Sequence, residues 1–259
     1  MTTWVLDLDG VVWLGSRPIP GAADAVAALR GAGHRVAYCT NNSSRTVAAY
    51  VDKLTGAGLP AAPDDVLTSA QAAALLVEPG ERVLAVADEG VREALGRRGA
   101  VVVGPHDAAA ADVQVDAVMI GYWRDFDYRS MDAASRAVLA GARFLATNTD
   151  PRYPHETGFS PGCGAIVASI ATATGRTPEV AGKPHDAMVQ LVTARCGDTG
   201  VVVGDTPATD GALAAALGWS FGLVLTGNTS AADVPAGADP EWVGADLAEL
   251  VARHGDGAR

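Results

Sequence analysis

The sequence lacks several features that mark whole classes of protein. Only three of its 259 residues are cysteines, Cys39, Cys163 and Cys196, and no two of them form a CxxC pair. This spacing argues against a disulfide framework or a zinc site and favours a reducing compartment. No apolar run approaches the roughly 18 residues of a membrane-spanning helix. Because only six residues precede Asp7, the apolar part of a signal peptide has no room there. We therefore expect a cytoplasmic protein with no membrane partner.

Basic residues are also scarce, since 19 Lys and Arg stand against 30 Asp and Glu and give a formal charge of −11. Proteins that bind nucleic acid contact its phosphates through a basic face, so this balance argues against a nucleic-acid partner. Hydrophobic residues make up 49% of the chain and charged residues 19%, which is enough apolar material for a sizeable core.

Short β-branched runs alternate with alanine-rich segments that have helical spacing. Eight runs of this kind are expected as strands: 4–8, 35–40, 82–86, 101–103, 117–120, 143–147, 201–203 and 222–225. Such alternation predicts an α/β fold in which helices cover both faces of a parallel sheet. The pattern restarts near Glu81 and begins its return near 175–177, which predicts a second α/β unit inserted into the first. We expect a core from 1–79 and 179–259 and an inserted domain from 80–178.

Polar clusters follow the predicted strands at four distant places. They are Asp7-Leu8-Asp9-Gly10, Thr40-Asn41-Asn42, Lys183 and Val203-Gly204-Asp205, the last with Asp210 five residues further on. The carboxyl ends of parallel strands form the ligand crevice of an open α/β sheet. We therefore expect these four clusters to converge on one site.

The residue types in these clusters suit phosphate chemistry. Asp7, Asp9 and Asp205 would repel one another unless a hard cation such as Mg²⁺ neutralised them. Lys183, Thr40 and Asn41 offer a positive charge and hydrogen-bond donors to phosphoryl oxygens. One carboxylate could then attack phosphorus while a second protonates the leaving oxygen and later activates water.

The four clusters together resemble the four motifs of the haloacid dehalogenase superfamily, and the resemblance covers essentially the whole chain. Within it, the segments 146–150 and 225–230 are similar to subclass IIA, the phosphatases related to NagD, p-nitrophenyl phosphatase and pyridoxal phosphatase. The resemblance implies a Rossmann-like, doubly wound core with an inserted α/β cap domain of the C2 type. Only 33 positions separate Asp7 from Thr40, whereas 141 separate Asn42 from Lys183, so the cap belongs in the second interval.

The resemblance also implies a role for each site residue. Asp7 is the expected nucleophile and Asp9 the expected general acid and base. The expected Mg²⁺ ligands are Asp7, Asp205 and the main-chain carbonyl of Asp9, with Asp210 orienting this group. The residues expected to hold the phosphoryl group are Thr40, Asn41 and Lys183. Those expected on the substrate side are Asn42 and, from a loop of the cap, Arg152 and Tyr153.

These expectations combine into a Mg²⁺-dependent phosphatase that acts through an aspartyl phosphate on a small phosphorylated metabolite. Phosphoglycolate, glycerol phosphate, pyridoxal phosphate and sugar or nucleoside monophosphates all remain open as substrates. A phosphomutase is the first alternative, although mutase relatives usually carry the cap between the first two motifs. A non-catalytic phospho-signalling receiver or binding protein is the other alternative, although a receiver needs only about half this length. Because relatives often pair through the cap, a homodimer of that kind is also expected.

Overall fold

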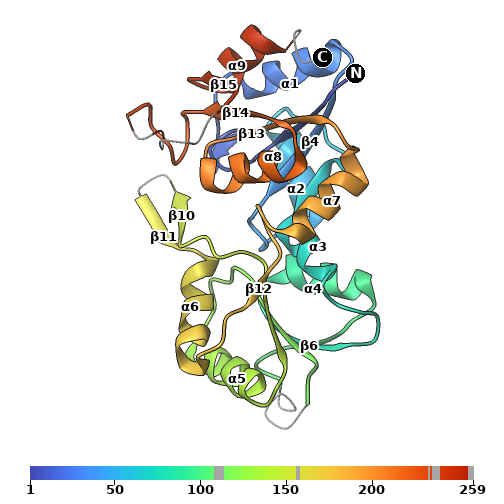
Figure 1. Ribbon diagram of the computed structural model, residues 1–259, viewed down its shortest axis with the longest axis vertical. Helices are drawn as coiled ribbons and strands as arrows, with labels where there is room; N and C mark the ends of the chain where they lie inside the picture. The colour runs from blue at the N-terminus through green and yellow to red at the C-terminus, as the bar shows by residue number, and fades with distance from the viewer. Residues whose placement is uncertain (108–113, 156–157, 233, 235–239, 256–259) are drawn as a thin grey trace.

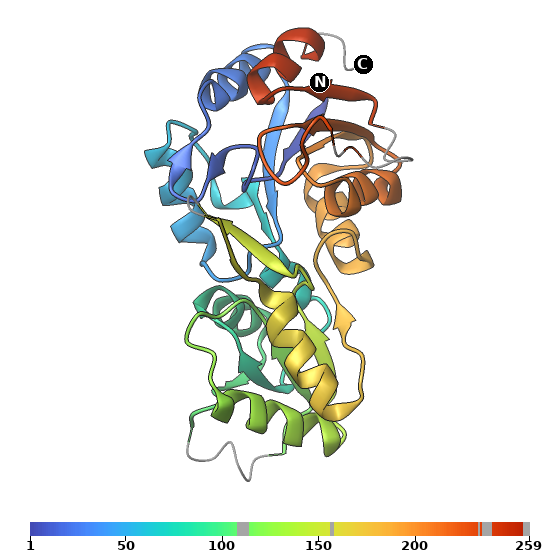
Figure 2. The same ribbon diagram turned by 90° about the vertical axis from the view of Figure 1, so that its left-hand side faces the viewer.

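The computed structural model describes residues 1–107, 114–155, 158–232, 234 and 240–255, which form two lobes (Figures 1 and 2). Both chain termini lie in one lobe, and the middle of the chain forms the other. Each lobe is built around its own parallel sheet. This arrangement is the one expected for a domain inserted into a core.

The sheet of the core lobe has the strand order β15-β14-β13-β1-β4-β5, and all of its pairs are parallel. Its strands are β1 (Thr3–Leu6), β4 (Arg35–Thr40), β5 (Val66–Thr68), β13 (Gly200–Gly204), β14 (Ser220–Val224) and β15 (Trp242–Gly244). Side chains alternate between the two faces of a strand. Trp4 and Leu6 therefore join one apolar cluster, whereas Val5 joins another.

Helices cover both faces of this sheet, as a doubly wound fold requires. One face carries α1 (Ala22–Gly31), α2 (Val47–Gly56) and α9 (Leu247–His254). The other carries α3 (Ser69–Ala74), α7 (Asp186–Cys196) and α8 (Ala212–Leu217). Two short helical turns complete the lobe, η1 (Pro63–Asp65) and η2 (Pro207–Gly211).

The sheet of the cap lobe has the order β12-β9-β8-β6-β7 and is also parallel. Its strands are β6 (Arg82–Val86), β7 (Val101–Val103), β8 (Ala117–Ile120), β9 (Arg143–Ala146) and β12 (Glu179–Val180). One face packs on α5 (Tyr128–Leu139) and α6 (Cys163–Thr174), and the other on α4 (Glu89–Arg98). The predicted fold class, a doubly wound core with an inserted α/β cap, is thus confirmed. The domain boundaries at 79/80 and 178/179 remain predictions.

Two antiparallel pairs stand apart from the main sheets, and neither was predicted as strands. The first, β2 (Trp13–Leu14) with β3 (Arg17–Pro18), belongs to the segment 10–18, which we call the flap. The second, β10 (Arg152–His155) with β11 (Gly158–Pro161), is called the cap hairpin. It extends from the cap lobe towards the core lobe (Figure 2). Among the residues described, no helix is long and apolar enough to cross a membrane.

Candidate active site

One cavity of about 430 Å³ lies between the two lobes, and every predicted site residue lines it. These residues lie at the ends of β1, β4 and β13 of the core sheet, after β12 of the cap sheet, in η2 and in the cap hairpin: Asp7, Asp9, Thr40, Asn41, Asn42, Arg152, Tyr153, Lys183, Asp205 and Asp210. The strand-end pattern therefore located the cavity correctly, while the role of each residue remains a prediction.

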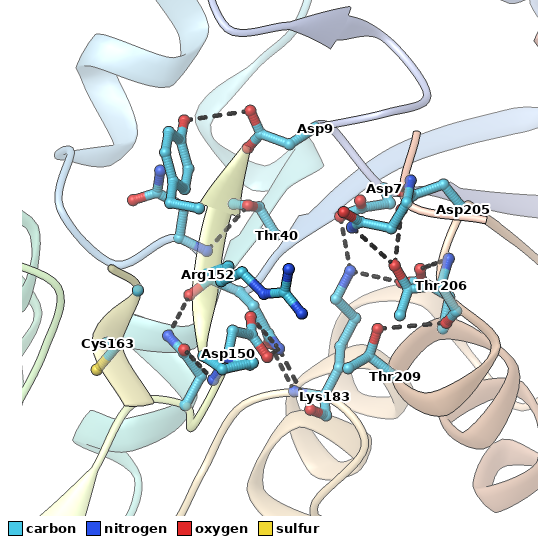
Figure 3. Close-up of a pocket in the computed structure, with 18 of the residues that line it drawn as sticks. Asp7, Asp9, Thr40, Asp150, Arg152, Cys163, Lys183, Asp205, Thr206 and Thr209 are labelled. Carbon is cyan, nitrogen blue, oxygen red and sulfur yellow. Dashed lines mark hydrogen bonds and ion pairs between the residues drawn. The ribbon is translucent and has the colours of Figure 1, made fainter. Parts of the chain in front are cut away.

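Lys183 is the buried centre of the charged network (Figure 3). Its Nζ donates to Asp7 Oδ1 and to Asp210 Oδ1, each at 2.6 Å, and to the Cys39 carbonyl oxygen at 3.1 Å. Burial raises the pKa of Asp7, and Lys183 opposes this shift. Burial acts to lower the pKa of Lys183, but Asp210 and Asp7 raise it well above its usual value. One ammonium group is thus shared by two carboxylates, and the site carries an excess of negative charge.

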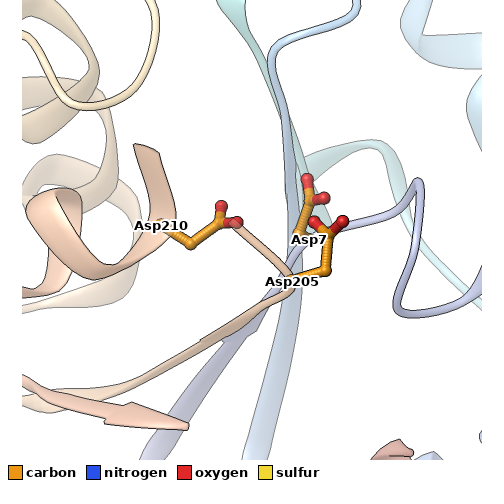
Figure 4. Close-up of side chains that lie close together, drawn as sticks. All are labelled: Asp7, Asp205 and Asp210. Atoms are coloured by element: carbon orange, nitrogen blue, oxygen red, sulfur yellow. The ribbon is translucent and has the colours of Figure 1, made fainter. Parts of the chain in front are cut away.

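A third carboxylate joins this group and makes it suitable for a metal ion. Asp7, Asp205 and Asp210 each offer a carboxylate oxygen within 4.8 Å of the others (Figure 4). Burial and the neighbouring Asp210 raise the pKa of Asp205 to about 6. Asp210 already accepts from Lys183 and from the Thr206 main-chain N–H, at 3.1 Å for the latter. All three side chains offer carboxylate oxygens, which are ligands that Mg²⁺ prefers, and the assignment of Asp7 and Asp205 as the ligands remains a prediction. The contribution of the Asp9 carbonyl stays a prediction.

Gly10 allows the Asp205 carboxylate to lie close to the segment after β1. Its φ is +96°, and a Cβ built there would lie 2.7 Å from the carboxyl group of Asp205. Any larger residue would combine backbone strain with a direct clash. The glycine in Asp7-Leu8-Asp9-Gly10 is thus required by the position of a side chain nearly two hundred residues away in sequence.

Asp9 is held by groups from both lobes. Its Oδ1 accepts from Trp13 Nε1 of the flap at 3.0 Å and from the Tyr153 hydroxyl of the cap hairpin at 3.2 Å. Burial raises the pKa of Asp9, while the charge of Lys53 and the bonds from Trp13 and Tyr153 oppose the shift. Tyr153, predicted as a substrate contact, thus also touches the predicted acid.

The side chain of Asn41 is engaged by neighbouring parts of the site. Its Nδ2 donates to Asp150 Oδ2 at 3.2 Å and to the Lys183 carbonyl at 3.3 Å, and its Oδ1 accepts from the Lys183 N–H at 2.8 Å. Its carbonyl oxygen accepts from Asn148 Nδ2 at 2.7 Å and Ser69 Oγ at 2.5 Å. If Asn41 binds a phosphoryl oxygen as predicted, the group best placed to do so is its main-chain N–H.

Sequence reasoning missed several residues that line the cavity or hold it together. Asn148 and Asp150 follow the end of β9, so the strand-end rule that identified the other residues could have found them. The Tyr122 ring stacks on Tyr153 with ring centres 5.4 Å apart. The Arg152 guanidinium lies 5.4 Å from the centre of the Phe159 ring. These contacts depend on the cap hairpin, which the sequence did not reveal.

The loop after β4 also anchors the cap. Ser43 is fully buried, and its Oγ accepts from the Tyr122 N–H and from Thr147 Oγ1, both at 3.1 Å. The Gly90 N–H at the start of α4 donates to the Ser44 carbonyl at 3.1 Å. The loop that follows Thr40 and carries Asn41 and Asn42 is therefore bonded directly to the cap lobe.

Comparison with known proteins identifies the family. The chain matches the model of haloacid dehalogenase-like hydrolases over residues 4–100 and a second model of such hydrolases over residues 180–250. It is 37% identical over 255 residues to D-glycerol 3-phosphate phosphatase of Mycobacterium tuberculosis, covering 95% of this chain and 70% of that protein. It is 33% identical over 260 residues to glycerol-3-phosphate phosphatase of Homo sapiens, covering 90% of this chain and 81% of that protein.

A solved structure agrees with these relatives. The glycerol phosphate phosphatase of Mycobacterium tuberculosis in complex with magnesium superposes with a TM-score of 0.87 at 36% identity, covering 96% of this chain and 76% of that one. The fold, the motifs and these relatives lead to one family. The chain belongs to the haloacid dehalogenase-like hydrolases, in their subclass IIA of phosphatases that act on phosphoric monoesters.

Proposed function

We propose that this phosphatase uses Mg²⁺ to hydrolyse small alkyl phosphomonoesters, with glycerol 3-phosphate as the preferred substrate, through an aspartyl phosphate on Asp7. The observation that carries the proposal is the position of Lys183, whose Nζ lies 2.6 Å from both Asp7 and Asp210 at the base of the cavity. A buried ammonium beside a nucleophilic carboxylate lets an anionic ester approach that carboxylate without prohibitive repulsion.

In the first step, a carboxylate oxygen of Asp7 attacks phosphorus while the bond from phosphorus to the alkoxyl oxygen breaks. Thr40 Oγ1, the Asn41 N–H and Lys183 bind the phosphoryl oxygens, since all three residues line the cavity beside Asp7. Asp9 gives its proton to the leaving oxygen, so the product leaves as an alcohol. Proton transfer of this kind contributes a factor on the order of 10²–10⁴ to the rate.

In the second step, Asp9 removes a proton from water, and that water attacks phosphorus and releases Asp7. In both steps the Asp9 carboxyl must face the position beside phosphorus that the leaving oxygen occupies first and the attacking water second. Trp13 and Tyr153 fix its Oδ1, which leaves Oδ2 to carry the proton. Asp210 acts indirectly because it accepts a second hydrogen bond from the ammonium of Lys183 that contacts Asp7.

The metal site is formed by Asp7, Asp205 and, as proposed, the Asp9 carbonyl. A bound Mg²⁺ would neutralise the excess negative charge and polarise a phosphoryl oxygen. Asp205 is kept in place by the Asn228 N–H and by Thr206 Oγ1. Carboxylate oxygens have further lone pairs, so these bonds leave Asp205 able to bind a cation.

The substrate preference rests on the two relatives named for glycerol phosphate and on the lining of the cavity. We expect the leaving group to face Asn42, Arg152 and Tyr153, together with the half-buried carboxylate of Asp150, since all four line the cavity. Asp150 repels a second anionic group but accepts hydrogen bonds from hydroxyls. A polyol phosphate therefore suits this side better than phosphoglycolate, whose leaving group carries a carboxylate.

The test is phosphate release from a panel of monoesters, with Mg²⁺ and with EDTA. The panel contains glycerol 3-phosphate, phosphoglycolate, pyridoxal phosphate, sugar phosphates and nucleoside monophosphates. We expect Mg²⁺-dependent turnover that disappears in Asp7→Asn and persists in Asp52→Asn, an exposed acid on α2. Labelling of Asp7 without phosphate release would point to a mutase, and neither labelling nor release to a binding protein.

Two proposals concern the setting of the enzyme. Buried free thiols at Cys39, Cys163 and Cys196 support a reducing, cytoplasmic location. The resemblance supports a homodimer paired through the cap. Light scattering on the purified protein tests the dimer, because a monomeric mass at micromolar concentration would contradict it.

A further inference from the structure

The chain contains only two lysines, Lys53 and Lys183, against 17 arginines. The two residue types are not interchangeable, because lysine carries a compact ammonium and arginine a broad planar group. Lys183 contacts Asp7 in the cavity, as described. Lys53 lies on α2, is half-buried and is absent from the cavity lining. No step of the proposed mechanism uses it.

Lys53 joins α2 to the flap. Its Nζ lies 3.5 Å from the centre of the Trp13 ring and donates to the Gly15 carbonyl oxygen at 3.0 Å. Trp13 belongs to β2, and Gly15 lies in the turn between β2 and β3. An ammonium over an indole ring is attracted by the negative face of the ring, most strongly when it is partly desolvated. Both contacts restrain the flap, one through a side chain and one through the backbone.

Trp13 extends this restraint to Asp9. The indole is 1% exposed, and its Nε1 donates to Asp9 Oδ1 at 3.0 Å. The backbone reinforces the contact, because the Gly10 N–H donates to the Trp13 carbonyl at 2.7 Å. The position of the indole therefore fixes one oxygen of the Asp9 carboxyl, and Lys53 packs on the same indole.

The same face of α2 also supports the other side of the site. Tyr50 lies one turn before Lys53, and residues three apart share a helix face. The Tyr50 hydroxyl donates to the Asn42 carbonyl at 2.8 Å. One helix thus supports both the flap beside Asp9 and the loop that follows β4.

We propose that Lys53 is a positioning residue for the acid and base Asp9. Its ammonium holds the Trp13 indole, and the indole holds Asp9 Oδ1 so that the other carboxyl oxygen faces the leaving group. This inference deepens the proposed function and rests on the role of Asp9 as the proton donor. Lys53 does not touch the substrate, so its loss should impair proton transfer and leave the other parts of the reaction largely intact.

Substrates with different leaving groups separate this role from a general structural one. An alkoxide leaves poorly without a proton, whereas p-nitrophenolate leaves readily without one. In addition, kcat/KM reports steps only through formation of the aspartyl phosphate, so its later hydrolysis does not enter. Full general-acid catalysis is worth on the order of 10²–10⁴. A misplaced acid should therefore lower kcat/KM strongly for an alkyl ester and weakly for p-nitrophenyl phosphate.

The experiment measures kcat/KM for p-nitrophenyl phosphate and for the alkyl phosphomonoester turned over best, which we expect to be glycerol 3-phosphate. For Lys53→Met we expect a loss of about tenfold on the alkyl ester and less than about threefold on p-nitrophenyl phosphate. Trp13→Phe should likewise lose more kcat/KM on the alkyl ester than on p-nitrophenyl phosphate. In the double variant with Lys53→Met, the difference between the two losses should be no larger than in Trp13→Phe alone. Lys53→Arg, which keeps a cation over the ring, should recover part of the alkyl-ester activity.

Two further variants serve as controls for the kinetics of Lys53→Met. Arg45→Met removes an exposed positive charge just before the same helix and, assayed well below pH 8 so that Lys53 is charged in both proteins, should leave the ratio of the two kcat/KM values unchanged. Equal losses on both substrates for Lys53→Met, or no recovery in Lys53→Arg, would overturn the positioning role. Asp9→Asn must itself show the leaving-group selectivity. If Asp9→Asn loses kcat/KM equally on both substrates, the proposed role of Asp9 is wrong. If Asp9→Asn loses more on the alkyl ester but Lys53→Met does not, the role of Asp9 stands and only the inference about Lys53 is refuted.

Discussion

Asn41 shows how one side chain can hold three parts of an active site. Its amide joins the end of β4 to Asp150 of the cap lobe and to the backbone of Lys183. These partners lie 109 and 142 residues away in sequence. Its position after a strand predicted that Asn41 belongs to the site, but partners so distant could not be read from the chain. The sequence thus indicated the place of Asn41 and not its bonds.

Removing the acceptor of this amide should reduce activity without destroying it. Asp150→Ala leaves Asn41 Nδ2 without its charged partner, and a hydrogen bond to a charged group is worth about 1.5–3 kcal/mol. We expect kcat/KM to fall roughly ten- to hundredfold. Asp150→Asn keeps an acceptor oxygen and should retain most of the activity. Steady-state kinetics on both variants check this, and equal damage in the two would show that activity depends on the negative charge of Asp150 and not on its bond to Asn41.

The pKa of Lys53 predicts a pH dependence. Burial lowers the pKa of Lys53 to about 8, Arg45 adds to this shift, and Asp9 opposes it. Lys53 is therefore charged below about pH 8 and loses its charge as the pH rises through that value. We expect kcat/KM on an alkyl ester to decline over the same range. In Lys53→Arg, whose guanidinium stays charged, the decline should move to higher pH. Identical alkaline profiles for the two proteins would rule out this explanation.

At the scale of elements, the sequence was reliable where a strand is a continuous buried run. The predicted strands at 82–86 and 201–203 correspond to β6 and β13, and both are almost entirely buried. The flap and the cap hairpin were missed because pairing, not composition, makes them strands. β2 and β3 have two residues each, and β10 contains Pro154, which normally argues against a strand. The bonds of Trp13 and Tyr153 to Asp9 were missed for the same reason, although Tyr153 itself was predicted on the substrate side.

The junction between α4 and the loop after β4 has no room for a side chain at Gly90. A Cβ there would lie 2.3 Å from the Arg45 carbonyl oxygen and 2.5 Å from that of Ser43. Gly90→Ala should therefore push the helix and the loop apart, at a cost of roughly 1–3 kcal/mol in stability. Because this loop begins directly after Thr40 and carries Asn41, activity should fall as well.

Gly96 is a matched control on the same helix. A Cβ at this exposed position meets no atom within 4 Å. Gly96→Ala should stabilise the protein by about 0.5–1 kcal/mol through helix propensity and leave kcat/KM unchanged. Thermal unfolding and kinetics on the two variants provide the measurement. A harmless Gly90→Ala would show that the cap can shift away from the loop without loss of function.

At the scale of the whole molecule, the two lobes share one apolar cluster. It contains Val5, Ala37 and Val202 from the core sheet and Val83 and Met119 from the cap sheet. Helix α3 lies between the lobes and packs against both α7 and α4 (Figure 1). The inserted cap therefore has one sheet face covered by its own α5 and α6, and the other by its own α4 together with α3 of the core. The insertion pattern in the sequence predicted two units but gave no sign of this shared core.

A shared core predicts that the lobes unfold together. Burial of apolar surface is worth about 25 cal/mol per Å², so melting the cap alone would expose the common cluster and lose that contribution. We expect a single denaturant transition with the same midpoint by far-UV circular dichroism and by tryptophan fluorescence. The tryptophans report on the two lobes separately. Trp123 follows β8 of the cap, whereas the core lobe contains Trp4, Trp13, Trp219 and Trp242. Subtracting the fluorescence of Trp123→Phe from that of the wild type, at each denaturant concentration, gives the signal of the cap. If this signal changes at a lower denaturant concentration than the core signal, the cap is an independent folding unit and the shared cluster does not couple the lobes.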